Sequence, residues 1–181
     1  MKKNRTSCGL KIVYTGDGKG KTTAALGMCV RAVGYEWKIC LIQFIKGSWK
    51  YGELKGVKRL EPNLELHVVG EGFVGILDDN KELKVHQEAA RKGLELALEK
   101  IESGLFQLVI LDELNVALKL GLVDKEEVLR LLAACSVDQH LVITGRDAPD
   151  WLIDQADLVT SMTEIKHPFR EGIQAQKGID W

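Results

Sequence analysis

The chain has 181 residues, of which 45% are hydrophobic and 28% charged, with a formal net charge of −1 at pH 7. That length suits a single globular domain, and no apolar run is long enough to cross a bilayer, so no membrane partner is expected. The balanced charge gives no basic excess of the kind that binds nucleic acid, so no nucleic-acid partner is expected either.

The cysteines and the N-terminus indicate a cytoplasmic protein. Four cysteines are scattered along the chain without a C-x-x-C pair: Cys8, Cys29, Cys40 and Cys135. Cys29 and Cys40 lie in apolar segments, which is typical of reduced core residues. The polar N-terminus lacks the apolar centre of a signal peptide.

Six apolar segments are predicted to be strands, at residues 10–14, 38–44, 64–69, 107–111, 140–144 and 157–162. Most are continuous apolar runs, which is typical of strands buried on both faces of a parallel sheet. Helices are predicted between them, at residues 22–33, 79–103 and 124–134. The last of these begins with Asp124 and carries Glu127 three residues later, a form of capping box. The alternation predicts an α/β fold with a mostly parallel sheet and helices on both faces.

We expect residues 1–181 to form one domain. Residues 1–9 are predicted to be a flexible N-terminal arm, and residues 166–181, which show no clear element, to be a closing tail. Residues 46–62 form the longest irregular segment in the first half of the chain. Irregular segments of this length in compact domains often carry function.

The most informative stretch is a glycine-rich run, residues 15–23, between the first predicted strand and the first predicted helix. Three glycines in it allow the backbone N–H groups to turn toward an anion: Gly16, Gly18 and Gly20. The start of the helix adds its positive end, Lys21 adds a mobile charge, and the Thr22 hydroxyl can bind Mg²⁺. The run therefore predicts a phosphate-binding loop in a RecA-like P-loop domain.

A second phosphate-site motif lies at the end of the fourth predicted strand. Asp112 and Glu113 follow an apolar run, as the carboxylates of a Walker B strand do, and can reach Mg²⁺ held by Thr22. Adjacent residues at a strand end point in different directions, so one can face metal while the other orients water, ribose or backbone. The sequence does not decide which residue does which.

Further basic residues are predicted at the same edge of the sheet. Arg146 follows the fifth predicted strand, and Lys46 follows the second. Ligands bind at the carboxyl edge of open α/β sheets, so Arg146 is a candidate partner for a polyphosphate. Lys19, inside the loop, is a further candidate for a phosphate contact.

These residues predict a protein that binds a magnesium nucleotide, and they leave its reaction open. P-loops serve kinases, ATPases and other transferases. A kinase or ATPase would need a second-substrate hydroxyl site or a positioned water, and neither is identifiable in the sequence. A non-catalytic module that binds its ligands without turnover is another alternative.

The order of the motifs adds a resemblance. The blocks that carry it are residues 16–25, 31–34, 43–47, 72–73, 111–113, 143–146, 166–169 and 172–181. That series resembles the P-loop class of ATP:corrinoid adenosyltransferases, also called cob(I)alamin or cob(I)yrinic acid a,c-diamide adenosyltransferases. The resemblance covers the chain from about residue 10 to its end, and blocks 43–47 and 172–181 make it specific.

The resemblance implies a reaction and its participants. A reduced corrinoid, with cobalt as Co(I), attacks the 5′-carbon of ATP, forms adenosylcobalamin or a precursor, and releases triphosphate. ATP and the corrinoid are then the substrates and Mg²⁺ the metal. An electron-donating reductase such as a flavoprotein is the implied partner, and the implied assembly is a homodimer.

The resemblance also implies roles for individual residues. The expected ATP- and phosphate-binding residues are Gly16, Asp17, Gly18, Lys19, Gly20, Lys21, Thr22, Thr23, Arg31 and Arg146. The expected magnesium ligands are Thr22, Glu113 and Asp112. The expected corrinoid-binding residues are Gly72 and Phe73, and Phe73 would pack on the corrinoid face and help to displace the lower axial ligand of cobalt. The residues expected to act in catalysis are Lys21, Glu113 and Phe73.

Overall fold

The computed structural model describes residues 8–47, 51–72, 74 and 81–180, and its described part is built on a six-stranded sheet. The strands are β1 (Lys11–Thr15), β2 (Ile39–Gln43), β3 (Leu64–Val68), β4 (Leu108–Asp112), β5 (His140–Thr144) and β6 (Leu158–Ser161). All of them are parallel, in the order β3-β2-β4-β5-β1-β6. The predicted parallel sheet is confirmed, and each strand end lies within one residue of its predicted position.

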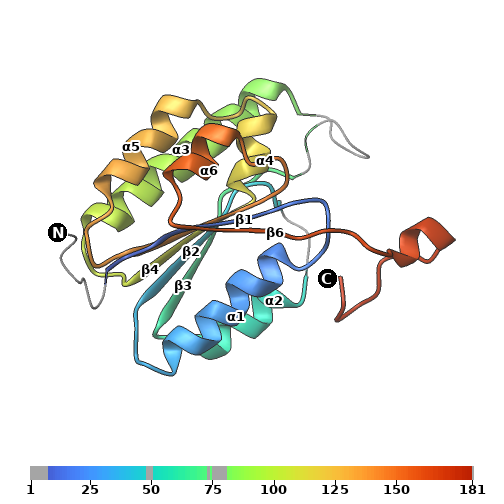
Figure 1. Cartoon of the computed structure of the whole chain (residues 1–181), viewed down its shortest axis with the longest axis horizontal. Coiled ribbons are helices and arrows are strands. Elements are labelled where there is room, and N and C mark those ends of the chain that lie inside the picture. The colour runs from blue at the N-terminus through green and yellow to red at the C-terminus, as the bar shows by residue number, and fades with distance from the viewer. Residues whose placement is uncertain (1–7, 48–50, 73, 75–80, 181) are drawn as a thin grey trace.

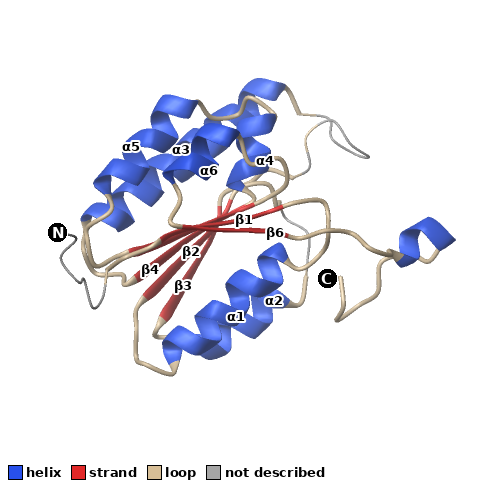
Figure 2. Cartoon of the chain, viewed as in Figure 1, coloured by secondary structure: helices blue, strands red, loops and turns tan. Residues whose placement is uncertain are grey.

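Helices cover both faces of the sheet, as predicted (Figures 1 and 2). On one face lie α1 (Lys21–Val33) and α2 (Glu53–Gly56), followed by the 3₁₀ helix η1 (Val57–Leu60). On the other lie α3 (Leu83–Glu102), α4 (Leu114–Lys119), α5 (Lys125–Ala134) and α6 (Asp150–Gln155). The predicted capping box of α5 is present, and the Asp124 amide donates to Glu127 Oε2 at 2.8 Å.

Several sequence-based boundaries need correction. The segment predicted to be irregular, residues 46–62, contains α2 and η1, and the predicted tail contains η2 (Pro168–Glu171). These elements, like the unpredicted α4 and α6, are no longer than six residues, too short for a helical period to show in a sequence. The long helix α3 begins at Leu83 because Glu82 has an extended backbone, and residues 79–80 lie outside the described residues.

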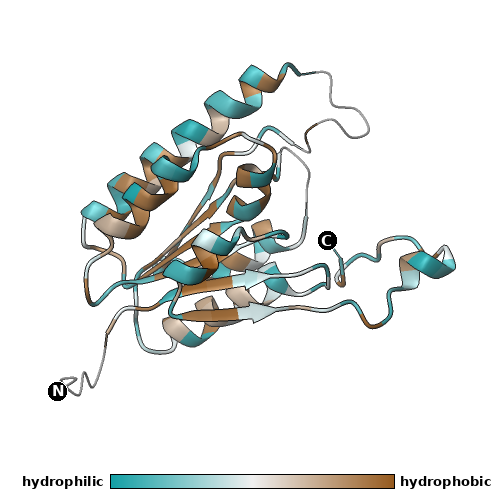
Figure 3. Cartoon of the chain, turned by 45° about the horizontal axis from the view of Figure 1, so that its top comes forward, coloured by the Kyte–Doolittle hydropathy of each residue, from teal (hydrophilic) through white to brown (hydrophobic). Residues whose placement is uncertain are grey.

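The core is divided by the sheet into two apolar layers. One lies between the sheet and helices α3 to α6, and the other between the sheet and α1 with η1. Figure 3 shows apolar residues gathered on the strands and the inner sides of the helices. Cys40 belongs to the first layer and Cys29 to the second, which confirms the prediction that both are core residues. Burial raises the pKa of each thiol to about 12.

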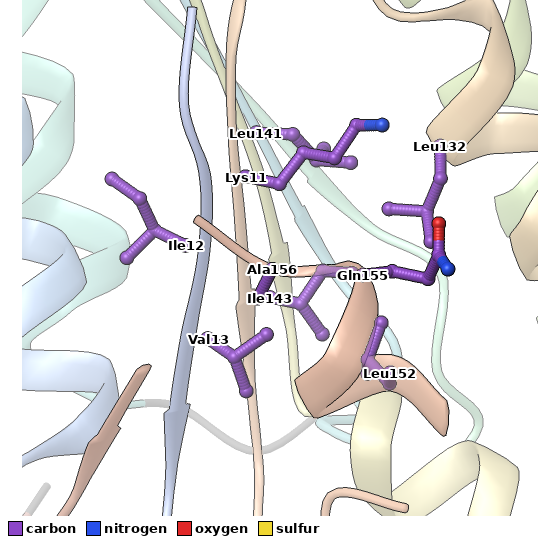
Figure 4. Close-up of a pocket in the computed structure, with 9 residues that line it drawn as sticks. All are labelled: Lys11, Ile12, Val13, Leu132, Leu141, Ile143, Leu152, Gln155 and Ala156. Carbon is purple, nitrogen blue, oxygen red and sulfur yellow. The ribbon is translucent and has the colours of Figure 1, made fainter. Parts of the chain in front are cut away.

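The gap in Figure 4, where β1 and β5 meet α5 and α6, is part of this packing. Val13, Ile143 and Leu152 are among the side chains that line it, and it has no room for a water molecule. It is therefore core packing and not a ligand site. Among the described residues, no helix combines the length and the apolarity that crossing a bilayer would require.

Two helical glycines predict opposite effects of the same substitution. A Cβ on Gly93 in α3 would lie 2.6 Å from Val69 Cγ2 and 2.9 Å from Phe44 Cε1, whereas a Cβ on Gly27 in α1 would meet nothing within 4 Å. We expect Gly93→Ala to destabilise the protein by about 1–3 kcal/mol through overpacking. Gly27→Ala should stabilise it by about 0.5–1 kcal/mol, the usual gain in a helix. Urea unfolding of both variants tests this, and a stabilised Gly93→Ala variant would contradict the packing.

After β6 the chain leaves the sheet, forms η2, and returns toward the glycine-rich loop (Figure 1). The return is marked by an ion pair between Asp180 Oδ1 and Lys19 Nζ. Gln176 N also donates to Asp180 Oδ2 at 2.7 Å, which orders the last turn. Asp180 therefore lies beside the predicted phosphate loop.

Candidate functional site

The glycine-rich loop lies between the end of β1 at Thr15 and the start of α1 at Lys21. Gly16 and Gly20 have φ angles of 91° and 107°, which side chains rarely allow. A Cβ on Gly16 would also lie 2.4 Å from the carbonyl oxygen of Met162. Gly18 N donates to that same oxygen at 2.8 Å, so the loop passes tightly over the segment that follows β6.

The first turn of α1 places the two reactive side chains of the loop. The Lys21 ammonium donates to the carbonyl oxygens of Gly16, at 2.6 Å, and Gly18, at 2.7 Å, so it lies inside the loop. Burial lowers the pKa of Lys21, and the Glu113 carboxylate opposes that shift. Thr22 Oγ1 donates to Asp112 Oδ1 at 2.8 Å, which joins the loop to the carboxylate at the end of β4.

Asp112 is fully buried and is held from several sides. Its Oδ1 accepts hydrogen bonds from Thr22 and, at 2.7 Å, from the hydroxyl of Thr144 at the end of β5. Its Oδ2 accepts from Gln43 Nε2 at 3.1 Å and lies 3.6 Å from Lys46 Nζ. Because β4 lies between β2 and β5, the Asp112 carboxylate is hydrogen-bonded to side chains from both neighbouring strands.

Glu113 is half-buried at the start of α4, in a left-handed conformation with φ 63°. Its backbone N–H donates to Thr144 Oγ1 at 3.0 Å, so Thr144 links both carboxylate residues. Burial, with a smaller effect of Asp112, raises the pKa of Glu113, while the positive charges of Lys21, Lys46 and Arg146 oppose the rise.

This pKa shift predicts how stability depends on pH. When the pKa of a carboxyl is higher in the folded than in the unfolded chain, the unfolded chain ionises first as pH rises. The protein therefore loses stability as pH rises from about 4.5 through the folded pKa. In ligand-free protein, Glu113→Gln should therefore raise the Tm at pH 8, by about 2–4 °C for each kcal/mol gained. The gain should vanish toward pH 4.5, and Glu95→Gln on the exposed side of α3 should show none. Thermal unfolding across pH measures it, and a lower Tm at pH 8 would contradict the shift.

The residues present fit a magnesium ion. In the part of the chain that the structure describes, no three His, Cys, Asp or Glu side chains converge as a metal cluster. The hydroxyl of Thr22 meets the carboxylate of Asp112, and the carboxylate of Glu113 is close enough to that of Asp112 to interact with it electrostatically. Together they offer oxygens of the kind that Mg²⁺ prefers when phosphates and water supply the other ligands. Since the Thr22 hydrogen points to Asp112, the lone pairs of its oxygen remain for a cation.

With the exception of Arg31, the remaining predicted phosphate residues lie in the loop or next to it. Arg146, exposed after β5, donates from Nη2 to the carbonyl oxygen of Asp17 at 3.4 Å. Asp17 and Lys19 are exposed in the loop, and Thr23 is exposed in the first turn of α1. The loop, Arg146 and the two carboxylate residues thus lie at one edge of the sheet.

Comparison with known proteins shows to which family the chain belongs. Residues 7–181 match the family described as ATP:corrinoid adenosyltransferase BtuR/CobO/CobP. The chain belongs to this family. A corrinoid adenosyltransferase of Pseudomonas aeruginosa is 41% identical over 177 residues, which cover 98% of this chain and 86% of that one. One of Escherichia coli K12 is 37% identical, with 96% and 86% covered.

The chain is thus a corrinoid adenosyltransferase, which transfers the adenosyl group of ATP to a corrinoid. The kinase, ATPase and non-catalytic alternatives are set aside. Its fold is similar to that of the flagellar accessory protein FlaH from Methanocaldococcus jannaschii, with a TM-score of 0.55 over 86% of this chain and 71% of that one. At 13% identity this likeness concerns the fold alone.

One predicted phosphate residue of the adenosyltransferase requires correction. Arg31 is exposed in the last turn of α1. It follows Lys21 by ten residues, which places it about 15 Å along the helix from the phosphate loop. The structure does not bring Arg31 to the loop, and we leave it out of the site.

On the corrinoid side, Phe73 lies outside the described residues, and Gly72 is described. A Cβ on Gly47 would lie 2.6 Å from Gly72 N, and one on Gly70 would lie 2.3 Å from Phe44 O. The segment after β3 therefore packs, backbone against backbone, on the segment after β2. That segment carries Lys46, so the predicted corrinoid segment and the carboxylate site are near neighbours.

Sequence reasoning missed several side chains of the site. Gln43 and Thr144 are polar residues that end otherwise apolar strands beside β4, and that position is the signal that would have found them. Tyr51 and Glu53 lie in the segment predicted to be irregular, and no sequence pattern distinguishes them. Lys46 was noticed only for its place after a strand.

Proposed function

We propose that the P-loop of this adenosyltransferase holds the triphosphate of ATP as a leaving group, while Co(I) of a reduced corrinoid attacks the 5′-carbon. The observation that carries the proposal is the junction of Lys21, Thr22 and Asp112. It gathers the charge and the hydrogen-bond donors that a polyphosphate requires as it leaves.

The bonds and electrons of this reaction balance without a proton transfer. The cobalt supplies the electron pair of the new cobalt–carbon bond and becomes Co(III), and the C5′–O bond breaks with its pair leaving on triphosphate. No general base is needed, so the work of the chain is to align the reacting atoms, stabilise charge and exclude water.

Individual roles follow from position. The loop from Gly16 to Thr23, with Lys21 and Arg146, would bind the phosphates. Thr22, Asp112 and Glu113 would hold Mg²⁺, which supplies positive charge to the phosphate oxygens. Gly72 and Phe73 would bind the corrinoid, and the packing of Gly72 against Gly47 supports their place near the phosphate site.

The partners of the enzyme are also part of the proposal. Formation of Co(I) needs an electron donor, which a flavoprotein reductase would supply. A homodimer is supported by apolar side chains exposed along the C-terminal segment: Ile165 (96%), Phe169 (73%) and Ile179 (76%). Sedimentation at a mass of two chains would agree, and a monomer at all concentrations would not. The four free cysteines support a cytoplasmic location.

An anaerobic reaction tests the proposed chemistry. Protein, ATP, Mg²⁺ and chemically reduced cob(I)alamin are mixed, the visible spectrum is followed, and the phosphate product is assayed. We expect a light-sensitive adenosyl-cobalt spectrum with one triphosphate per corrinoid. ADP or inorganic phosphate, formed without that spectrum, would overturn the proposal.

A further inference from the structure

Gln43 and Asp112 form a buried pair at the carboxyl edge of the sheet. They are the last residues of β2 and β4, they face each other in the strand register, and both side chains are fully buried. Gln43 Nε2 donates to Asp112 Oδ2 at 3.1 Å. Buried amides are costly unless they are hydrogen-bonded, so this contact needs both ends of the amide to be satisfied.

Tyr51 satisfies the other end of the amide. Its hydroxyl donates to Gln43 Oε1 at 2.9 Å, which directs the NH₂ group of Gln43 to the carboxylate. The opposite orientation would set a carbonyl oxygen against a carboxylate oxygen and an NH₂ group against a hydroxyl proton. Burial raises the pKa of Tyr51 to about 12, so the phenol stays a donor at neutral pH.

The position of Tyr51 is in turn fixed by charged neighbours. Lys46 Nζ lies 4.9 Å from the centre of the Tyr51 ring, forms an ion pair with Glu53, and is 3.6 Å from Asp112 Oδ2. A lysine ammonium is a point charge with rotatable donors and does not by itself fix the plane of a carboxylate. The planar amide of Gln43, which is hydrogen-bonded at both its oxygen and its nitrogen, does fix the plane of the carboxylate.

The plane of the Asp112 carboxylate matters for the metal. Oδ1 accepts the hydroxyl hydrogens of Thr22 and Thr144, and in this way decides where the lone pairs of Thr22 point. If the Asp112 carboxylate rotated, the Thr22 hydroxyl would no longer be directed so that its lone pairs are available to the metal, even though every residue remained in place. Groups that orient metal ligands typically change metal affinity or activity by about 10–100-fold when they are removed.

We infer that Gln43 is a positioning residue for the metal-binding carboxylate, and that Tyr51 acts through Gln43 by fixing the orientation of its amide. The inference rests on the magnesium site of the proposed function and deepens it. It assigns a role to the segment after β2, whose described residues Lys46, Tyr51 and Glu53 converge on the Gln43–Asp112 pair.

The test measures magnesium affinity and does not depend on turnover. Gln43→Met removes both hydrogen bonds at similar volume, and Tyr51→Phe removes only the hydroxyl. Tyr35→Phe, at an exposed position just after the end of α1, is the matched control. ATP binding is titrated by calorimetry at several Mg²⁺ concentrations and in EDTA. Thermal unfolding checks that each variant is folded.

We expect the apparent Mg²⁺ affinity in the presence of ATP to fall by about 10–100-fold in Gln43→Met and by about 2–10-fold in Tyr51→Phe. Affinity for ATP in EDTA should stay within about twofold, since the loop itself is unchanged. In turnover, kcat should fall more than KM for ATP changes. Tyr35→Phe should match the wild type in every measurement.

Two results would overturn the inference. The first would leave the proposed magnesium site standing, and the second would remove it. Wild-type Mg²⁺ affinity in folded Tyr51→Phe and Gln43→Met would remove the positioning role and leave the magnesium site standing. ATP binding that does not depend on Mg²⁺ in the wild type would remove the magnesium site and the inference together. If Gln43→Met does not fold, Tyr51→Phe, changed only at a half-buried hydroxyl, decides alone.

Discussion

Replacing Lys21 by alanine should lower kcat/KM for ATP in the adenosylation reaction by about 10²–10³-fold, the usual cost of removing a preorganised charge from a developing anion. Lys21 is the ammonium that lies inside the loop, on the carbonyl oxygens of Gly16 and Gly18. In the variant, the positive charge nearest to the departing triphosphate would be missing, so the negative charge that develops on it would be less stabilised. Steady-state kinetics with cob(I)alamin under anaerobic conditions measures the loss.

The control for this prediction is Lys58→Ala, an exposed lysine in η1. It should leave both kinetics and unfolding unchanged. Since the Lys21 side chain is buried, thermal unfolding of Lys21→Ala must show a folded protein before its kinetics are interpreted. A folded Lys21→Ala variant with near-normal turnover would show that the triphosphate is not bound in this loop.

Asp112→Asn should impair both the site and the stability of the protein. The carboxylate accepts hydrogen bonds at Oδ1 from two hydroxyls and at Oδ2 from the Gln43 amide. An asparagine has only one oxygen, so its NH₂ group must face either the hydroxyl protons or the amide donor. We expect a loss of about 1–3 kcal/mol in the free energy of unfolding, the cost of a buried polar group left unsatisfied.

The same substitution should lower adenosylation by at least about 10-fold, because Asp112 would itself hold Mg²⁺ and also orients the Thr22 hydroxyl, and loss of orientation alone typically costs about 10–100-fold. Asp124→Asn is the matched control, because asparagine caps a helix about as well as aspartate does. Urea unfolding and kinetics on both variants give the comparison. If Asp112→Asn proved as stable and as active as Asp124→Asn, the buried carboxylate would have no part in binding or positioning.

The fold was predictable where a pattern is long or chemically distinctive. The apolar runs predicted the central strands β1, β2, β4 and β5, because strands buried on both faces require continuous apolar residues. The edge strands β3 and β6 were also predicted, although most of their residues are not buried. The loop at Gly16 was predictable because its φ angle and its contact with Met162 allow no side chain. The capping box at Asp124 was predictable because it is local in the sequence.

Much of the site was not predictable, because it depends on strand order. A sequence does not say that β5 lies between β1 and β4, and that order is what brings Thr144 onto Asp112. Gln43 depends in the same way on β2 lying beside β4. Arg31 shows the opposite failure, since a residue that belongs to a family motif lies at the far end of its helix from the phosphate loop.

The central claim is that the bond broken in ATP is the one between the 5′-carbon and oxygen. The most direct measurement uses ATP labelled with ¹⁸O at the 5′-bridging oxygen, in the anaerobic reaction with cob(I)alamin, followed by mass spectrometry of the products. We expect all of the label in triphosphate and none in the adenosyl corrinoid. Label that stays on the 5′-carbon of the nucleoside would mean cleavage between oxygen and phosphorus, and would contradict the proposed displacement.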